Sequence, residues 1–113
     1  MNIGIVSYWF NRGQATVGRY IRTIYDELGY GTRVLARPTK DKFTLPSYVA
    51  KTDVWNQAGV TFAGRYDISI EEYKRWVADN NIIIVFFDQN YQFDEIKILR
   101  AEGVITIGRF VWE

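Results

Sequence analysis

Short apolar runs alternate with amphipathic segments along most of the chain, and this alternation limits the fold more than any other feature. The clearest run, residues 82–87 (IIIVFF), is apolar at every position, which predicts a central strand of a parallel sheet. Shorter runs of the same kind occupy residues 3–8, 32–37, 59–64 and 104–108. Strands of this kind, connected mainly through helices, are typical of an α/β domain.

Three segments between these runs carry helical signals. In residues 15–28 the apolar side chains recur at spacings of three and four residues: Val17, Tyr20, Ile21, Ile24, Tyr25 and Leu28. This stripe is expected to face the sheet, with Arg22 on the opposite face and Gly29 as a left-handed cap. The S-x-x-E run from Ser69 has the spacing of a capping box, which predicts that a second helix begins at the next residue. Asp94 is the expected N-cap of a third helix.

Together these elements predict a Rossmann-like domain with three α/β/α layers around a parallel five-stranded sheet. Right-handed crossovers then give the strand order 3-2-1-4-5. Residues 1–113 are expected to form one domain, because a chain of this length supports a single hydrophobic core. In such a sheet the ligand crevice lies at the carboxyl ends of the strands, where the order reverses between the strands that begin at Ile3 and Ile82.

The composition excludes several classes of function. The chain has no Cys and no His, which rules out disulfides, thiolate or imidazole metal sites and His-dependent catalysis. Its 14 Lys and Arg nearly balance 13 Asp and Glu, so no basic field would attract nucleic acid. No apolar run is long enough to span a bilayer, and the first residues lack the basic start of a secretory signal. We therefore expect a cytoplasmic protein with no metal, no cofactor, no nucleic-acid partner and no transmembrane segment.

Polar residues that can bind a ligand fall in the loops at the predicted crevice. Arg12, Gly13 and Gln14 lie between the first strand and the first helix, where a glycine lets backbone N–H groups approach an anion or a sugar. Asp88 and Asn90 follow the apolar strand and carry groups that hydrogen-bond sugar hydroxyls. These five are the predicted substrate-binding residues. Structural alternatives stay open: a tight turn into the helix for the glycine, and anchoring of their own loop for Asp88 or Asn90.

Aromatic residues gather near the same predicted rim: Tyr8, Trp9, Phe10, Tyr91 and Trp112. Their rings can stack on the C–H faces of sugars or pack over the end of the sheet, and for any single ring we expect packing. Arg12 and Arg109 lie on opposite loops, where they would either meet a phosphate or stay solvated.

The known nucleotide motifs do not fit the glycine segment. It is neither G-x-G-x-x-G nor a P-loop, since Arg19 stands where the P-loop has Lys. Arg37 occupies the position at the end of the second strand where a dinucleotide-binding domain has its acidic ribose ligand. Both observations disfavour a nicotinamide-dependent enzyme. Gly18 is expected to allow close packing of the helix on the sheet.

The opening of the chain resembles the N-terminal domain of GT-B glycosyltransferases of the group 1, or family 4, type. The similarity rests on residues 3–10, the loop at residues 12–14 and the run DELGYGTRVL at residues 26–35, where Tyr30 replaces the usual His. Residues 76–87 and 102–107 are also similar to that domain, so the resemblance covers most of the chain.

This resemblance implies a two-domain enzyme that transfers a sugar from a nucleotide-sugar donor to a glycan or lipid-linked acceptor in the cleft between its domains. The N-terminal domain shapes the acceptor side, and its glycine loop, matched here by residues 12–14, approaches the donor diphosphate and the transferred sugar. The C-terminal domain grips the nucleotide. On this basis we expect residues 1–113 to be part of the N-terminal domain of an enzyme of carbohydrate biosynthesis, peripheral to a membrane in its parent form and inactive alone.

A second hypothesis is a free-standing Rossmann-like module that binds a small molecule or a protein. The aromatic residues of the loops would then mark its binding surface. An exposed sheet edge or apolar face would also allow the chain to form a homo-oligomer.

Overall fold

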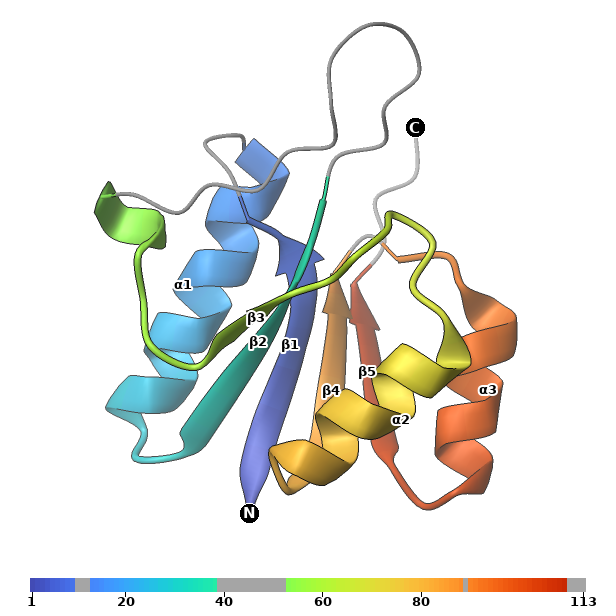
Figure 1. Ribbon diagram of the computed structural model, residues 1–113. Helices are drawn as coiled ribbons and strands as arrows, with labels where there is room; N and C mark the ends of the chain where they lie inside the picture. Colours follow the sequence, from blue (N-terminus) through green and yellow to red (C-terminus); the bar gives the residue numbers. More distant parts are fainter. Residues whose placement is uncertain (10–12, 39–52, 89, 110–113) are drawn as a thin grey trace, which may run out of the picture.

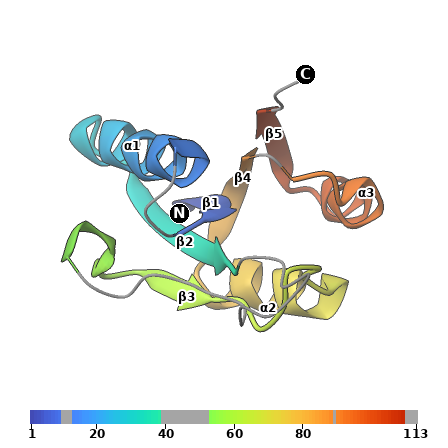
Figure 2. The same ribbon diagram turned by 90° about the horizontal axis from the view of Figure 1, so that it is seen from above.

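The computed structural model describes residues 1–9, 13–38, 53–88 and 90–109, excluding the side chains of residues 13–15 and 53. The elements lie in three layers, with α1 on one face of a sheet and α2 and α3 on the other (Figures 1 and 2). The strands are β1 (Asn2–Tyr8), β2 (Gly31–Arg37), β3 (Val60–Phe62), β4 (Ile82–Asp88) and β5 (Ile105–Arg109). The helices are α1 (Gly13–Glu27), α2 (Ile70–Asp79) and α3 (Phe93–Ala101), and η1 (Asp53–Trp55) is a short 3-10 turn.

All five strands are parallel and follow the order β3-β2-β1-β4-β5, as the sequence predicts. Tyr8 at the end of β1 lies opposite Arg37 at the end of β2, and Asp88 at the end of β4 lies opposite Arg109 on β5. The strand order reverses between β1 and β4, so the predicted switch point is confirmed. The carboxyl ends of these strands therefore share one edge of the sheet.

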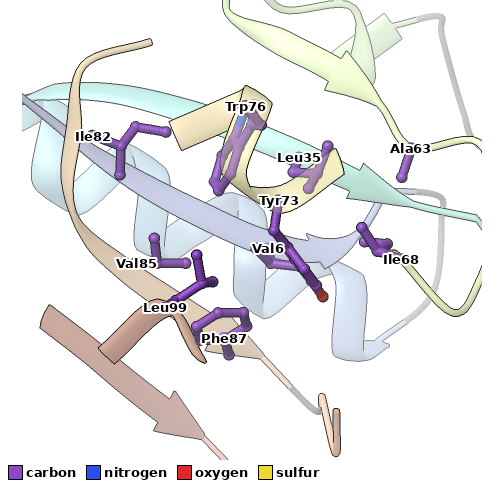
Figure 3. Packing of buried hydrophobic residues seen from close by; sticks show 10 residues of the cluster. All are labelled: Val6, Leu35, Ala63, Ile68, Tyr73, Trp76, Ile82, Val85, Phe87 and Leu99. Carbon is purple, nitrogen blue, oxygen red and sulfur yellow. The ribbon is translucent and has the colours of Figure 1, made fainter. Parts of the chain in front are cut away.

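The face under α2 and α3 carries the larger buried cluster (Figure 3). Its members are Val6, Leu35, Ala63, Ile68, Tyr73, Trp76, Ile82, Val85, Phe87 and Leu99. The rings of Tyr73 and Phe87 meet edge to face with their centroids 5.9 Å apart. Gly4 of β1 makes room for the Trp76 ring, because a methyl group at Gly4 would overlap it. This face of the sheet is covered along both of its halves.

The opposite face is covered over only one half. There α1 and the segment around η1 cover a smaller cluster made of Ile5, Trp9, Val34, Ala36 and Trp55. Over β4 and β5 this face carries none of the described helices (Figure 2). Ile105 and Ile107 of β5 are accordingly 58% and 41% exposed.

The buried side of α1 differs from the predicted stripe. Three residues of that stripe are more than half exposed: Tyr20, Ile24 and Leu28. Arg22, expected on the solvent side, is buried and donates hydrogen bonds to the Thr32 hydroxyl, the Gln57 side chain and the Ala58 carbonyl. These hydrogen bonds satisfy the guanidinium and make its burial tolerable. Gly18 of α1 packs against Ser7 of β1, so the side of the helix that carries Gly18 and Arg22 faces the sheet, and the three exposed apolar residues turn away from it.

The predicted start of α2 is confirmed. Ser69 is the N-cap, and its hydroxyl accepts a hydrogen bond from the backbone N–H of Glu72. The Glu72 carboxylate accepts from the backbone N–H of Gly64, which ties the helix to the segment before it. Gly29 follows α1 with a φ of 88°, the left-handed cap that the sequence predicts.

The predicted N-cap of α3 is wrong. Gln92 occupies the cap position without a side-chain cap hydrogen bond, and Asp94 lies in the first turn of the helix. The Gln92 side chain binds the Ile68 carbonyl and the Tyr73 hydroxyl, which fixes the chain just before the helix. Asp94 still stabilises this end, because an acidic side chain in the first turn interacts favourably with the helix dipole.

No helix in the described ranges is both long enough and apolar enough to cross a membrane.

Candidate functional site

The first turns of α1 and the ends of β1 and β4 meet at the carboxyl edge of the sheet. Gly18 lies so close to β1 that a methyl group there would overlap the Ser7 hydroxyl and sit 3.7 Å from Oδ2 of Asp88. The Ser7 hydroxyl is buried and donates to the Tyr8 carbonyl. The close packing expected at Gly18 is therefore confirmed, and it brings Asp88 next to the helix. We call Ser7, Gly18, Asp88 and Arg109 the rim site.

Asp88 and Arg109 form an ion pair within this rim site. Nε of Arg109 donates to Oδ1 of Asp88 at 2.7 Å, and the Asp88 side chain is only 2% exposed. Burial raises the pKa of Asp88 above its ordinary value, while the hydrogen bond and charge of Arg109 oppose this rise. Arg109 is 31% exposed, so its remaining N–H groups lie near solvent. The pair therefore offers a cation and a carboxylate side by side.

The predicted residues of the glycine loop are only partly described. Arg12 lies outside the described residues. Gly13 and Gln14 form the first turn of α1, because the helix begins two residues before the predicted start at Ala15. A first helical turn directs its backbone N–H groups toward its N-terminal end, which for α1 is the carboxyl edge of the sheet (Figure 1).

Asn90 lies in a buried hydrogen-bond network. Its Nδ2 donates to the Tyr73 hydroxyl at 2.9 Å, and its Oδ1 accepts from the backbone N–H of Gln92 at 2.8 Å. The Tyr73 hydroxyl in turn donates to Oε1 of Gln92 at 2.7 Å. Burial, the largest influence, raises the pKa of Tyr73 far above its ordinary value, so this hydroxyl stays protonated. Both ends of the Asn90 amide are used within the protein, which favours the loop-anchoring alternative over direct contact with a ligand.

The aromatic residues of the predicted rim divide between packing and exposure. Trp9 is completely buried, its Nε1 donates to the Trp55 carbonyl at 2.8 Å, and the two indoles meet edge to face. The packing interpretation of Trp9 is thus confirmed. Tyr91 is 45% exposed, while Phe10 and Trp112 lie outside the described residues.

Sequence reasoning missed the environment of Arg37 at the end of β2. This side chain is 3% exposed, and its Nε donates to the Tyr66 carbonyl at 2.7 Å. Its guanidinium carbon lies 3.9 Å from the centre of the Tyr66 ring. The only available signal was the position of an arginine at the end of a buried strand, because its partners come from a segment far along the chain.

Comparison with known protein families, with curated proteins and with solved structures finds no match to this chain. Within the described parts of the chain, no three His, Cys, Asp or Glu side chains lie together as metal ligands.

Proposed function

We propose that this domain is the acceptor-side half of a GT-B glycosyltransferase, and that its rim faces a nucleotide-sugar donor held by a second domain. The observation that supports this most directly is the close approach of Gly18 in α1 to Ser7 in β1, which leaves no room for a side chain and places the helix beside Asp88 in β4. It joins the N-terminal turns of a helix to a charged pair at the switch point of a parallel sheet. Ligands of open α/β sheets bind at such a point.

Each part of the rim has a role in this proposal. The backbone N–H groups at Gly13 and Gln14 suit the negative charge of the donor diphosphate, because they lie at the positive end of the α1 dipole. Arg109 adds a cation on the opposite side of the rim. The buried Asp88 carboxylate orients Arg109 toward the ligand through their ion pair, and the buried Asn90 holds the loop in place. The glycan or lipid-linked acceptor would approach across the same rim.

The proposal is tested by NMR titration of the ¹⁵N-labelled chain with glucose 1-phosphate, inorganic diphosphate and uridine. We expect weak, saturable shifts of the Gly18, Asp88 and Arg109 amides with the first two ligands. Uridine should shift none of them, because nucleoside recognition would belong to the other domain. Tight uridine binding by residues 1–113, or sugar-phosphate shifts elsewhere on the molecule only, would contradict the proposal.

Arg109→Gln is the variant that tests the rim directly, with Arg100→Gln as its matched control. Both changes remove one positive charge, but Arg100 lies in the last turn of α3, away from Asp88. We expect the first variant to weaken diphosphate binding about tenfold and the second to change it by less than about twofold. Equal losses in the two variants would indicate attraction by net charge alone.

The uncovered sheet face favours a second candidate, a module that binds another protein. Ile105 and Ile107 expose apolar side chains on β5, and Ile24 and Leu28 do so on α1. Exposed apolar surface of this kind is typical of interaction sites. Sedimentation of the chain over a range of concentrations tests self-association: a dimer dissociated by Ile107→Lys would support this candidate, and a monomer throughout would exclude a homo-oligomer.

A further inference from the structure

Arg37 is more deeply buried than any other cation that the structure describes. It is the last residue of β2 and follows Leu35 on the side of the sheet that α2 and α3 cover. Its guanidinium lies against the segment between β3 and α2, where Tyr66 and Asp67 are located. The rim site contacts α1 instead, so the two places lie on different sides of the sheet.

In the part of the chain that the structure describes, the Arg37 guanidinium donates its hydrogen bond through Nε, on one edge of the group, and not through the two terminal nitrogens on the other edge. Nε donates to the Tyr66 carbonyl at 2.7 Å, and the flat group lies over the Tyr66 ring, with the Tyr8 ring 5.9 Å away. Within the described ranges, the partner of the edge formed by the two terminal nitrogens is a distant one: Nη2 lies 3.9 Å from Oδ1 of Asp67. Buried Nη1 has no hydrogen-bond partner among the described residues.

Arg22 shows how this fold satisfies a buried guanidinium when its role is structural. All three of its nitrogens donate, to Thr32, Gln57 and the Ala58 carbonyl, and the carboxylate of Asp26 lies 3.8 Å from its Nε. A buried cation is normally compensated in this way, by hydrogen bonds and a counter-charge. Among the residues described, Arg37 has one hydrogen-bond partner, the Tyr66 carbonyl, and one distant carboxylate, that of Asp67, whose side chain is 77% exposed. Within the described parts of the chain, the Arg37 guanidinium is therefore less fully compensated than that of Arg22.

We propose that Arg37 is the anchor of a binding subsite for an oxyanion, a phosphate or a carboxylate carried by a ligand. The two terminal nitrogens form the flat fork that binds two oxygens of such a group at once. Stacking on Tyr66 holds the fork in one plane, and the hydrogen bond from Nε fixes its direction. The anion approaches from the side of Asp67, whose exposed side chain turns away as the anion binds. This subsite goes beyond the proposed glycosyl transfer and does not depend on it.

The test is an NMR titration of the ¹⁵N-labelled chain with inorganic phosphate, with sodium chloride holding the ionic strength constant. We expect saturable shifts of the Arg37, Tyr66 and Asp67 amides and of the Arg37 side-chain Nε–H signal. A parallel titration with acetate distinguishes a phosphate from a carboxylate as the preferred group. Shifts that chloride alone reproduces at the same ionic strength would overturn the proposal.

Arg37→Gln and Arg33→Gln form a matched pair of variants. Both remove a positive charge from β2, but Arg33 lies near the start of the strand, where its Nη1 donates to the neighbouring Thr32 carbonyl. We expect Arg37→Gln to weaken phosphate binding about tenfold or more, and Arg33→Gln to change it by less than about twofold. Equal effects would show that phosphate responds only to net charge, and would overturn the proposal.

If the Arg37→Gln variant fails to fold, Asp67→Asn still tests whether Arg37 binds an oxyanion. Asp67 is exposed, so this variant keeps the core intact, and removing the competing carboxylate should strengthen phosphate binding roughly two- to fivefold. Unchanged or weaker binding would overturn the proposal. Because the signals of Asp88 and Arg109 are read in the same spectra, a failure here is distinguishable from a failure of the rim site to bind sugar phosphates.

Discussion

The two faces of this sheet are made from similar apolar strands, yet they are covered to different extents. Under α2 and α3 the buried cluster extends from Leu35 on β2 to Phe87 on β4. On the other face α1 covers only the half at β1 and β2, and β5 exposes Ile107. An apolar strand sequence therefore indicates a sheet but does not show how many of its faces are covered. Burial, and with it stability, depends on which helices lie over each strand.

The largest expected effect compares the same substitution on the two faces. Ile82→Ala, at the start of β4 under α2, should lower the free energy of unfolding by about 2–5 kcal/mol, because Ile82 is buried and leaves a cavity. Ile105→Ala, at the start of β5 on the exposed face, should cost about 1 kcal/mol or less. Urea unfolding of both variants measures the difference. Equal losses would mean that another surface covers β5 in solution.

The contact of α1 with the sheet gives the next largest effect. Gly18→Val would place side-chain atoms where the Ser7 hydroxyl lies and push the helix from β1, at a cost of about 1–3 kcal/mol. Gly64→Ala is the control, since a Cβ there meets nothing within 4 Å and should leave stability within about 0.5 kcal/mol. Thermal unfolding of the two variants reads out the contrast. A stable Gly18→Val protein would show that α1 can shift on its half-covered face.

The two faces also differ in how much of their structure could be predicted from the sequence. Parallel strands, their order and the close approach at Gly18 follow from local patterns and from the handedness of crossovers. The burial of Arg22 and Arg37 does not, because each is satisfied by residues far along the chain, such as Gln57 and Tyr66. Helical periodicity identified the apolar stripe of α1 but not its exposure, since Tyr20, Ile24 and Leu28 of that stripe are more than half exposed while Arg22 is buried.

The candidate site was predictable to a similar degree. The sequence correctly predicts that Asp88 lies at the carboxyl edge of the sheet. Asp88 follows the apolar strand next to the switch point, and all parallel strands end at the same edge. The ion pair of Asp88 with Arg109 and the burial of Asn90 could not be predicted, because they depend on how side chains from different elements pack together. The polar residue types after β4 correctly indicated the loop at the rim. Packing determines that Arg109 stays near solvent whereas Asp88 and Asn90 are buried.

A smaller effect tests the polar network within the covered face. Tyr73→Phe removes the hydroxyl that accepts from Asn90 and donates to Gln92, and it leaves the buried Asn90 amide without that partner. We expect a loss of about 1–2 kcal/mol, measured by urea unfolding. Tyr20→Phe on the exposed side of α1 should have almost no effect. If Tyr73→Phe were neutral, the network would not be needed to hold the β4–α3 loop.

The smallest effect concerns pH on the half-covered face. Burial raises the pKa of Asp88 in the folded chain, so the folded state holds this proton more tightly than the unfolded state does. The contribution of Asp88 is then fully present below its ordinary pKa of 3.8, and it is lost as the pH rises through the higher folded value. Relative to Asp88→Asn, which does not titrate, the wild type should gain stability as the pH falls through this window. Because Arg109 opposes the shift, the gain should be small, and urea unfolding of both proteins at several pH values measures it. A relative loss on acidification would mean that the Arg109 ion pair outweighs the effect of burial, and that the carboxylate at the rim is held ionised.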